Sequence, residues 1–175
     1  MKSFQIVKSE TMYRGRVFDV RQDQVRLPND KLTDLDVVEH SGSITLLPID
    51  DEGRIWFVRQ YRHPARVELI ELPAGVLENG ETPEDCAYRE IREETGMAAR
   101  RLKRVGEFFL APGYSTEYMY VFVATELHSS PLQRDADEFI NVEKIPLEQV
   151  YEMARKGRFR DSKTLAALFL AQPHL

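Results

Sequence analysis

Apolar and polar residues alternate in short stretches along the first 40 residues, a pattern typical of half-buried strands. Residues 17–20 and 24–27 show this alternation, and residues 36–39 follow a turn signal, Pro-Asn-Asp, at 28–30. These stretches predict a strand-rich arm in residues 1–40.

The next segment, residues 43–49, is more uniformly apolar, as expected of a central strand. Residues 50–53, Asp-Asp-Glu-Gly, then form a turn signal before the apolar residues 54–58. This order predicts a β-hairpin. Another strand is predicted at residues 67–72.

The residues after position 81 carry the signals of a well-defined helix. Thr82 suits the N-cap, Pro83 the first helical position, and the charges of Glu84 and Asp85 complement the positive end of the helix dipole. Gly96 can end the helix in a left-handed conformation. We therefore expect a helix between Thr82 and Gly96.

The remainder of the chain alternates between predicted strands and helices. Strands are expected at residues 107–110, 118–123 and 139–142. Pro146 begins a helix that Gly157 ends, and either Asp161 or Ser162 caps a last helix that ends near Ala171.

Composition narrows the class of protein. The 175 residues are 42% hydrophobic and 30% charged, which describes a globular protein with one well-buried core. No apolar run is long enough to span a membrane, and the charged N-terminal stretch lacks a signal core, so we expect a cytoplasmic protein. The single cysteine, Cys86, excludes an intramolecular disulfide, and the net charge of -5 argues against general nucleic-acid binding.

Three glutamates form an acidic stripe on the predicted helix. At 100° per residue, Glu90, Glu93 and Glu94 lie within an arc of about 100°, beside an apolar arc that contains Ala87 and Ile91. Their mutual repulsion destabilises an isolated helix, and a bound divalent cation would remove that cost. The alternative is a solvated acidic face, which the helix geometry by itself favours.

The spacing of the residues around this stripe decides between the two interpretations. It matches the Nudix box, G-x5-E-x7-R-E-U-x-E-E-x-G-U with U aliphatic, at every fixed position. The matching residues are Gly75, Glu81, Arg89, Glu90, Ile91, Glu93, Glu94, Gly96 and Met97. Chance agreement of its Gly, Glu and Arg positions is on the order of 10⁻⁹ per start site. The chain therefore resembles the Nudix hydrolases.

This resemblance implies an α/β fold: a Nudix α/β/α sandwich with a mixed sheet in residues 41–175, plus the N-terminal antiparallel β-sheet arm of residues 1–40. It also implies that Glu90, Glu93 and Glu94 act in catalysis and, together with the Ala74 carbonyl, bind metal. Mg²⁺ is the expected metal, with Mn²⁺ and Zn²⁺ as alternatives.

Two other charged residues of the box have supporting roles by the same resemblance. Arg89 is expected to pair with Glu93 and hold it in place, and Glu81 to support the junction between loop and helix.

Residues upstream of the box resemble the ADP-ribose pyrophosphatase subfamily. Residues 71–75, Glu-Leu-Pro-Ala-Gly, match its E-L-P-A-G run, and residues 59–62 resemble its R-Q-x-R strand end. By this resemblance Arg62 contacts the pyrophosphate, with Arg59 as a second substrate-binding residue. The alternative is that both arginines are solvated strand ends.

Two segments downstream of the box also resemble this subfamily. Pro112 occupies the position of the proline associated with ADP-ribose hydrolysis, and Glu117 ends a similar loop, where a substrate contact and a simple strand start remain alternatives. In the acidic run 135–140, Glu138 is the expected general base, with Asp137 as second choice.

Together these resemblances imply a metal-dependent pyrophosphohydrolase that converts ADP-ribose and water to AMP and ribose 5-phosphate. The substrate alternative is another nucleoside diphosphate sugar, such as GDP-mannose or UDP-glucose. A non-catalytic ADP-ribose sensor is a third interpretation, which the complete box disfavours. The resemblance also implies a homodimer formed through the N-terminal arm, where Tyr13 or Phe18 could stack on adenine.

Overall fold

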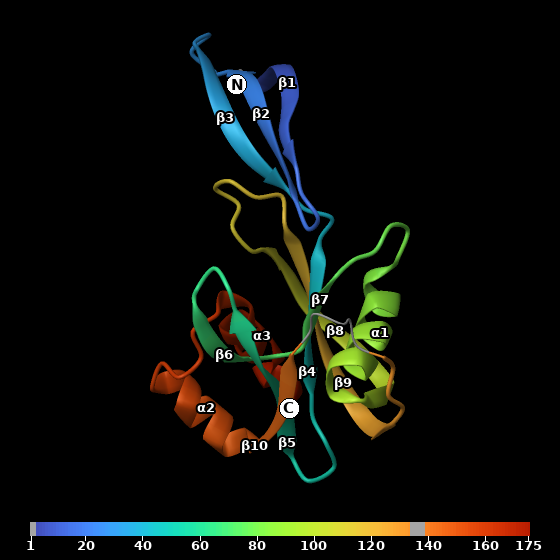
Figure 1. The fold of residues 1–175 in the computed structure, drawn as a ribbon. Helices are drawn as coiled ribbons and strands as arrows, with labels where there is room; N and C mark the ends of the chain where they lie inside the picture. The colour runs from blue at the N-terminus through green and yellow to red at the C-terminus, as the bar shows by residue number, and fades with distance from the viewer. Residues whose placement is uncertain (1–2, 134–138) are drawn as a thin grey trace. The chain divides into compact units, whose positions relative to one another are not determined.

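The computed structural model describes residues 3–133 and 139–175. The chain folds into two compact units (Figure 1). Unit 1 consists of residues 1–42 and 109–118, and unit 2 of residues 43–108 and 119–175. None of the helices in the described residues is long and apolar enough to cross a membrane.

Unit 1 contains an antiparallel three-stranded sheet in the order β1-β2-β3. Its strands are β1 (Gln5–Arg14), β2 (Asp19–Arg26) and β3 (Leu32–Glu39). The expected antiparallel arm is therefore present, but its strand boundaries were wrong, since residues 19–26 form one continuous strand. The hydrophobic pattern did not predict β1, because all residues of this strand are exposed and no buried face imposes an alternating pattern.

The segment 109–118 joins unit 1 through β3. Val38 forms a parallel bridge with Ser115, and its backbone N–H donates to the Tyr114 carbonyl at 2.8 Å. The Thr116 backbone N–H donates in return to the Val38 carbonyl at 2.9 Å. The loop that contains Pro112 is thus attached to the edge of the N-terminal sheet.

Unit 2 contains two sheets. The four-stranded sheet has the order β7-β4-β9-β8, formed by Ala74–Val76, Ser43–Pro48, Tyr118–Ser129 and Met97–Phe109. The three-stranded sheet has the order β10-β5-β6, formed by Ile140–Pro146, Arg54–Arg62 and Val67–Glu71. Strand β4 runs parallel to β9 and antiparallel to β7, so the expected mixed sheet is confirmed.

The hairpin predicted across residues 50–53 is wrong. The turn itself forms, with the Gly53 N–H donating to the Asp50 carbonyl at 2.9 Å, but β4 and β5 then enter different sheets. An isolated antiparallel bridge between Ile49 and Ile55 joins the two segments, and the Asp50 N–H donates to the Arg54 carbonyl at 3.0 Å. Strand β4 instead pairs with two strands that are distant in the sequence, a choice that no local turn signal can reveal.

Strand β8 is longer than predicted, because it begins at Met97 rather than near residue 107. The four-stranded sheet has β8 at its edge, where several of its side chains are exposed. An edge strand tolerates charged side chains, so residues 97–106 contain arginines and a lysine in place of a clear apolar alternation.

Buried residues of β4 face both sides of the four-stranded sheet, because successive side chains of a strand alternate between faces. Ile44 and Leu46 pack with Ala87 and Ile91 of helix α1 (Pro83–Thr95). Leu47 belongs to the other cluster, which includes residues from α2 (Leu147–Arg155) and α3 (Ser162–Ala171). Helices therefore cover both sides of this sheet, as the predicted α/β/α sandwich requires.

The predicted helix ends are also confirmed. Thr82 accepts a hydrogen bond from the Asp85 N–H, Pro83 is the first helical residue, and Gly96 is left-handed with a φ of 74°. Asp161, rather than Ser162, caps α3 by accepting from the Thr164 N–H. A short 3-10 helix (Gln172–His174) follows α3.

Candidate active site

Two of the three stripe glutamates are buried in unit 2. Glu90 is 7% exposed and Glu94 is 3% exposed, whereas Glu93 is partly exposed. The Glu90 carboxylate lies directly against the backbone of Gly75, because a β-carbon built on Gly75 would overlap it. The first glycine of the box is therefore required by close approach of a carboxylate rather than by a turn.

The segment before Gly75 is held from both sides. The Ala74 N–H donates to Glu94 Oε2 at 3.0 Å. The Pro73 carbonyl accepts from the Leu46 N–H at 2.8 Å and from the Thr45 hydroxyl at 3.2 Å. Residues 73–75 are thus fastened to β4 on one side and to the carboxylates of α1 on the other.

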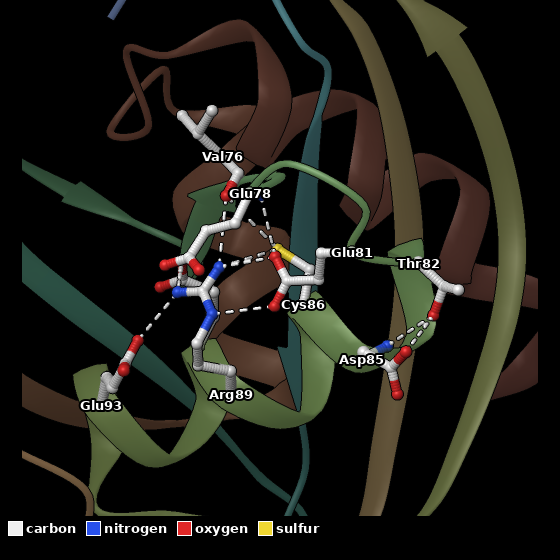
Figure 2. A network of polar contacts seen from close by, with 9 residues as sticks. Val76, Glu78, Glu81, Thr82, Asp85, Cys86, Arg89 and Glu93 are labelled. Atoms are coloured by element: carbon white, nitrogen blue, oxygen red, sulfur yellow. Dashed lines mark hydrogen bonds and ion pairs between the residues drawn. The ribbon is translucent and has the colours of Figure 1, made fainter. Parts of the chain in front are cut away.

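Arg89 is the hub of the polar network around the helix (Figure 2). Its guanidinium binds both oxygens of Glu81 at 2.9 Å, and Nη1 donates to Glu90 at 2.6 Å and to Glu93 at 2.9 Å. It also donates to the Val76 carbonyl at 3.2 Å. The predicted pairing of Arg89 with Glu93 is confirmed, and Glu81 joins the loop to the helix through the same arginine.

This network shifts the titration of its members. The bidentate hydrogen bonds from Arg89 lower the pKa of Glu81 to about 2, against the opposing effect of burial. In return, the carboxylates of Glu81, Glu90 and Glu93 raise the pKa of Arg89, and the hydrogen bonds to Glu81 are the largest cause. Both groups therefore remain charged at neutral pH, and Arg89 carries the positive charge that holds the acidic residues together.

The donors gathered here have the chemistry of a site for a hard divalent cation, since they are carboxylate and carbonyl oxygens. Within the described part of the chain, however, no group of three or more acidic, histidine or cysteine side chains is arranged to hold a metal ion. Glu90 and Glu93 are engaged by Arg89, and Glu94 accepts from the Ala74 N–H.

A second charged cluster lies where β5 and β6 meet the start of α3. Arg62 donates to both oxygens of Glu71 at 2.7 to 3.2 Å, and Glu71 is 1% exposed. Lys163 also contacts Glu71 and donates to Asp161 at 3.0 Å. The hydrogen bonds to Glu71 are the main cause of the raised pKa of Arg62. The negative charges of Glu94 and Asp161 raise this pKa further, so Arg62 interacts electrostatically with Glu94 of the Nudix box.

Family models match two segments of the chain. Residues 39–168 match the model described as the NUDIX domain, and residues 4–35 match the nucleoside diphosphate sugar hydrolase N-terminal domain. The chain belongs to the NUDIX domain family.

Two relatives of known name match nearly the whole chain. An ADP-ribose pyrophosphatase from Bacillus subtilis (strain 168) is 37% identical over 96% of this chain and 93% of its own length. A methanol dehydrogenase activator from Bacillus methanolicus is 34% identical over 93% of this chain and 89% of its own. A crystal structure of an ADP compounds hydrolase superposes with a TM-score of 0.89 at 24% identity, covering all of this chain and 95% of the other, and so confirms the fold.

Arg59, Pro112 and Glu117 are the other predicted substrate residues of this NUDIX chain. Arg59 pairs with Glu143 of β10 at 2.5 Å, and it lies on the opposite face of β5 from Arg62 because the two are three residues apart. Pro112 and Glu117 belong to unit 1, where the Glu117 carbonyl accepts from the Leu110 N–H at 3.1 Å. Glu138 and Asp137 lie outside the described residues.

Lys163 and Glu71 are the members of this site to which sequence reasoning gave no role. Their contact joins residues 92 positions apart. Glu71 belongs to the recognised Glu-Leu-Pro-Ala-Gly run, so its position gave a partial signal. Nothing in the local sequence of Lys163 distinguishes it from an exposed lysine in the first turn of a helix.

Proposed function

We propose that this NUDIX protein hydrolyses ADP-ribose to AMP and ribose 5-phosphate with a divalent cation. The observation that carries the proposal is the packing of the buried carboxylates Glu90 and Glu94 against Gly75 and Ala74. Buried carboxylates are costly unless they are paired or coordinate a metal. The single positive charge of Arg89 is shared among Glu81, Glu90 and Glu93, and a bound cation would neutralise the remaining negative charge. The similarity to the Bacillus subtilis ADP-ribose pyrophosphatase supports this choice of substrate.

The cation would be held by Glu90, Glu93, Glu94 and the Ala74 carbonyl, and we propose Mg²⁺, with Mn²⁺ or Zn²⁺ as alternatives. When bound, a divalent cation neutralises phosphate charge and lowers the pKa of a coordinated water. Arg89 keeps Glu90 and Glu93 oriented through its two Nη1 hydrogen bonds. Removal of the cation with EDTA should therefore abolish hydrolysis, and added Mg²⁺ should restore it.

Arg62 is the proposed contact to the pyrophosphate, because its guanidinium is partly exposed and lies within electrostatic range of Glu94. A guanidinium stabilises the negative charge that develops on phosphoryl oxygens. We propose further substrate contacts for Arg59, Pro112 and Glu117, and the role of general base for Glu138. The proposed base would take a proton from the attacking water.

The N-terminal arm, residues 1–40, is proposed to form a homodimer interface, and the protein to act in the cytoplasm. The exposed apolar side chains of β1 and the residue before it support a covered surface: Phe4, Ile6, Val7, Met12 and Tyr13. The buried, unpaired Cys86 fits a reducing compartment.

A substrate panel tests the proposed function. Purified protein with Mg²⁺ would receive ADP-ribose, GDP-mannose or UDP-glucose, and phosphatase-released phosphate would report the products. We expect a clear preference for ADP-ribose. Preference for GDP-mannose or UDP-glucose would instead support the second candidate, a hydrolase of other nucleoside diphosphate sugars, with which the match of residues 4–35 is equally compatible. Binding of ADP-ribose without any turnover would indicate a sensor.

Glu94→Gln separates catalysis from folding in the same assay. The amide keeps the size of the side chain and an oxygen that can accept from the Ala74 N–H, but it removes the charge. We expect turnover to fall at least about a hundredfold, the scale on which misplaced catalytic groups act. The melting temperature should change little. Normal Mg²⁺-dependent turnover by this variant would contradict the assignment.

A further inference from the structure

The Glu71 cluster places two cations on one buried carboxylate. Glu71 is 1% exposed, and both Arg62 from β5 and Lys163 from α3 contact it. Lys163 is itself 12% exposed and bridges Glu71 to Asp161, which caps α3. The two positive charges, of Arg62 and Lys163, equal in number the two negative charges, of Glu71 and Asp161.

Arg62 uses one edge of its guanidinium on this carboxylate. Nε and Nη2 both donate to Glu71, whereas Nη1 makes no hydrogen bond to any residue in the described part of the chain. A guanidinium has a fixed planar fork of donors, so the edge that binds Glu71 determines the direction of Nη1. A group that holds the Glu71 carboxylate in place therefore also sets the direction of Arg62 Nη1.

Lys163 is the second cation that holds that carboxylate, and it comes from α3. Its ammonium contacts Glu71 Oε2, the oxygen to which Arg62 Nη2 donates. The residue that follows Lys163, Thr164, is fully buried, and its hydroxyl accepts a hydrogen bond from the Leu72 N–H at 2.9 Å. The first turn of α3 thus fixes both Glu71 and the backbone that leads to Ala74.

Stability alone is a weak explanation for this arrangement. Removing ions from water costs several kcal/mol each, and a buried ion pair is often no more stabilising than apolar residues of similar volume. A cluster that holds one arginine in a defined orientation has a different use, because charged donors act on phosphate most strongly when they are oriented in advance.

We propose that Lys163 and Glu71 are positioning residues that orient the Arg62 guanidinium toward the substrate phosphates. This inference rests on the proposed function, in which Arg62 contacts the pyrophosphate. Neither residue touches the substrate. Lys163 acts on Glu71, and Glu71 acts on Arg62.

A double-mutant cycle tests the proposal. Lys163→Met should lower kcat/KM for ADP-ribose about tenfold. If Arg62→Met acts mainly on kcat, Lys163→Met should also act on kcat, and if Arg62→Met acts mainly on KM, so should Lys163→Met. In the Arg62→Met background, Lys163→Met should cost less than about twofold, because there is no guanidinium left to orient. Lys163→Arg should retain activity within about threefold, since it keeps the charge. The same tenfold loss in both backgrounds would overturn the proposal.

The matched control is Lys156→Met. Lys156 also pairs with a glutamate, Glu152, at 2.6 Å, but that pair is exposed on α2. This variant should leave kcat/KM unchanged. If Lys163→Met fails to fold, as judged by its melting curve, Lys163→Gln replaces it, because the amide can still donate to Glu71 without the charge.

A spectroscopic measurement separates this inference from the proposed function. The side-chain Nε–H signal of Arg62, assigned by its loss in Arg62→Met, should exchange slowly with water in the unaltered protein. In the Lys163 variant it should exchange at least about tenfold faster. Unchanged exchange would overturn the positioning role. If the protein did not hydrolyse ADP-ribose at all, the proposed function would fail, and this exchange rate would still decide whether Lys163 orients Arg62.

Discussion

Gly75 and Glu90 illustrate how one residue of the box depends on another. The absence of a side chain at Gly75 creates the space that the Glu90 carboxylate occupies. Arg89 then fixes that carboxylate from the helix side with a hydrogen bond of 2.6 Å. The glycine and the arginine are therefore as necessary to the position of Glu90 as the helix that bears it.

Gly75→Ala should impair activity more than stability. Its β-carbon would displace the Glu90 carboxylate, and misplacement of a catalytic group by about 1 Å can cost about a hundredfold in rate. Steady-state kinetics with ADP-ribose and a melting curve would measure both effects. Gly106→Ala is the control, because its β-carbon would meet only the Leu170 side chain, at 2.8 Å. That control should lose stability but not activity, and equal losses of activity in both variants would contradict the argument.

Asp50 stabilises the turn between β4 and β5 and gives a prediction about pH. It accepts from the Arg54 N–H at 3.0 Å, from Arg54 Nε at 2.9 Å and from Trp56 Nε1 at 2.9 Å. Burial by itself would raise the pKa of Asp50, but these donors from Arg54 and Trp56 lower it overall. The folded state therefore favours the carboxylate.

Because the folded pKa of Asp50 lies below its unfolded value, its contribution is complete above about pH 4 and is lost as the pH falls through the folded pKa. Asp50→Asn should reduce the free energy of unfolding by about 1–3 kcal/mol at pH 7. The difference from the unaltered protein should be smaller at pH 3, which lies below the ordinary aspartate pKa of about 3.9. Urea denaturation at both pH values measures it, and a difference independent of pH would be inconsistent with this account.

At the scale of elements, helix α1 carries the proposed catalytic carboxylates, and both of its ends are stabilised by local contacts. Thr82 accepts from the Asp85 N–H at 3.1 Å and donates to the Asp85 carboxylate at 2.7 Å. At the other end, the Gly96 N–H donates to the Arg92 carbonyl at 3.1 Å. These contacts fix where the helix begins and ends, and so the positions of its glutamates along the β7 strand.

Thr82→Ala should therefore destabilise the protein by about 1 kcal/mol, the usual cost of losing an N-cap side chain. Amide hydrogen exchange should accelerate in the first turn of α1 before it does elsewhere. Thr82→Ser, which retains the hydroxyl, serves as the control and should behave like the unaltered protein. Equal destabilisation by alanine and serine would assign the effect to the lost methyl group instead.

At the scale of the whole molecule, the apolar face of β1 is the clearest indication of a further interface. An edge strand with exposed apolar side chains is a site for pairing or covering by another chain. Strand β1 lies at the edge of its sheet, and Ile6 and Met12 are 62% and 59% exposed. A second copy of this chain is the proposed occupant.

Ile6→Glu should weaken that dimer, because it places a charge in an apolar interface. Sedimentation at micromolar concentration should show a dimer for the unaltered protein and a larger monomer fraction for the variant. Gln5→Glu adds a negative charge to the same strand without removing an apolar side chain, so it should remain dimeric. A monomeric unaltered protein at micromolar concentration would contradict the proposed homodimer.

Local patterns were sufficient to identify the family, the capped helix α1 and the buried central strand β4. Each depends on neighbours in the sequence: the fixed spacing of the box, the Thr82 and Gly96 caps, and the uniformly apolar residues 43–49. Such signals arise because a helix repeats about every 3.6 residues and a strand about every two.

Tertiary structure decided the features that depend on distant partners. Strands β4 and β5 separate into different sheets because β4 pairs with β9 and β7 rather than with its neighbour in the chain. Lys163 reaches Glu71 across 92 positions, and Arg62 donates to the same oxygen of Glu71. Local sequence reports which conformation a segment prefers, but the partner of a strand or of a charge is chosen by packing and burial over the whole unit.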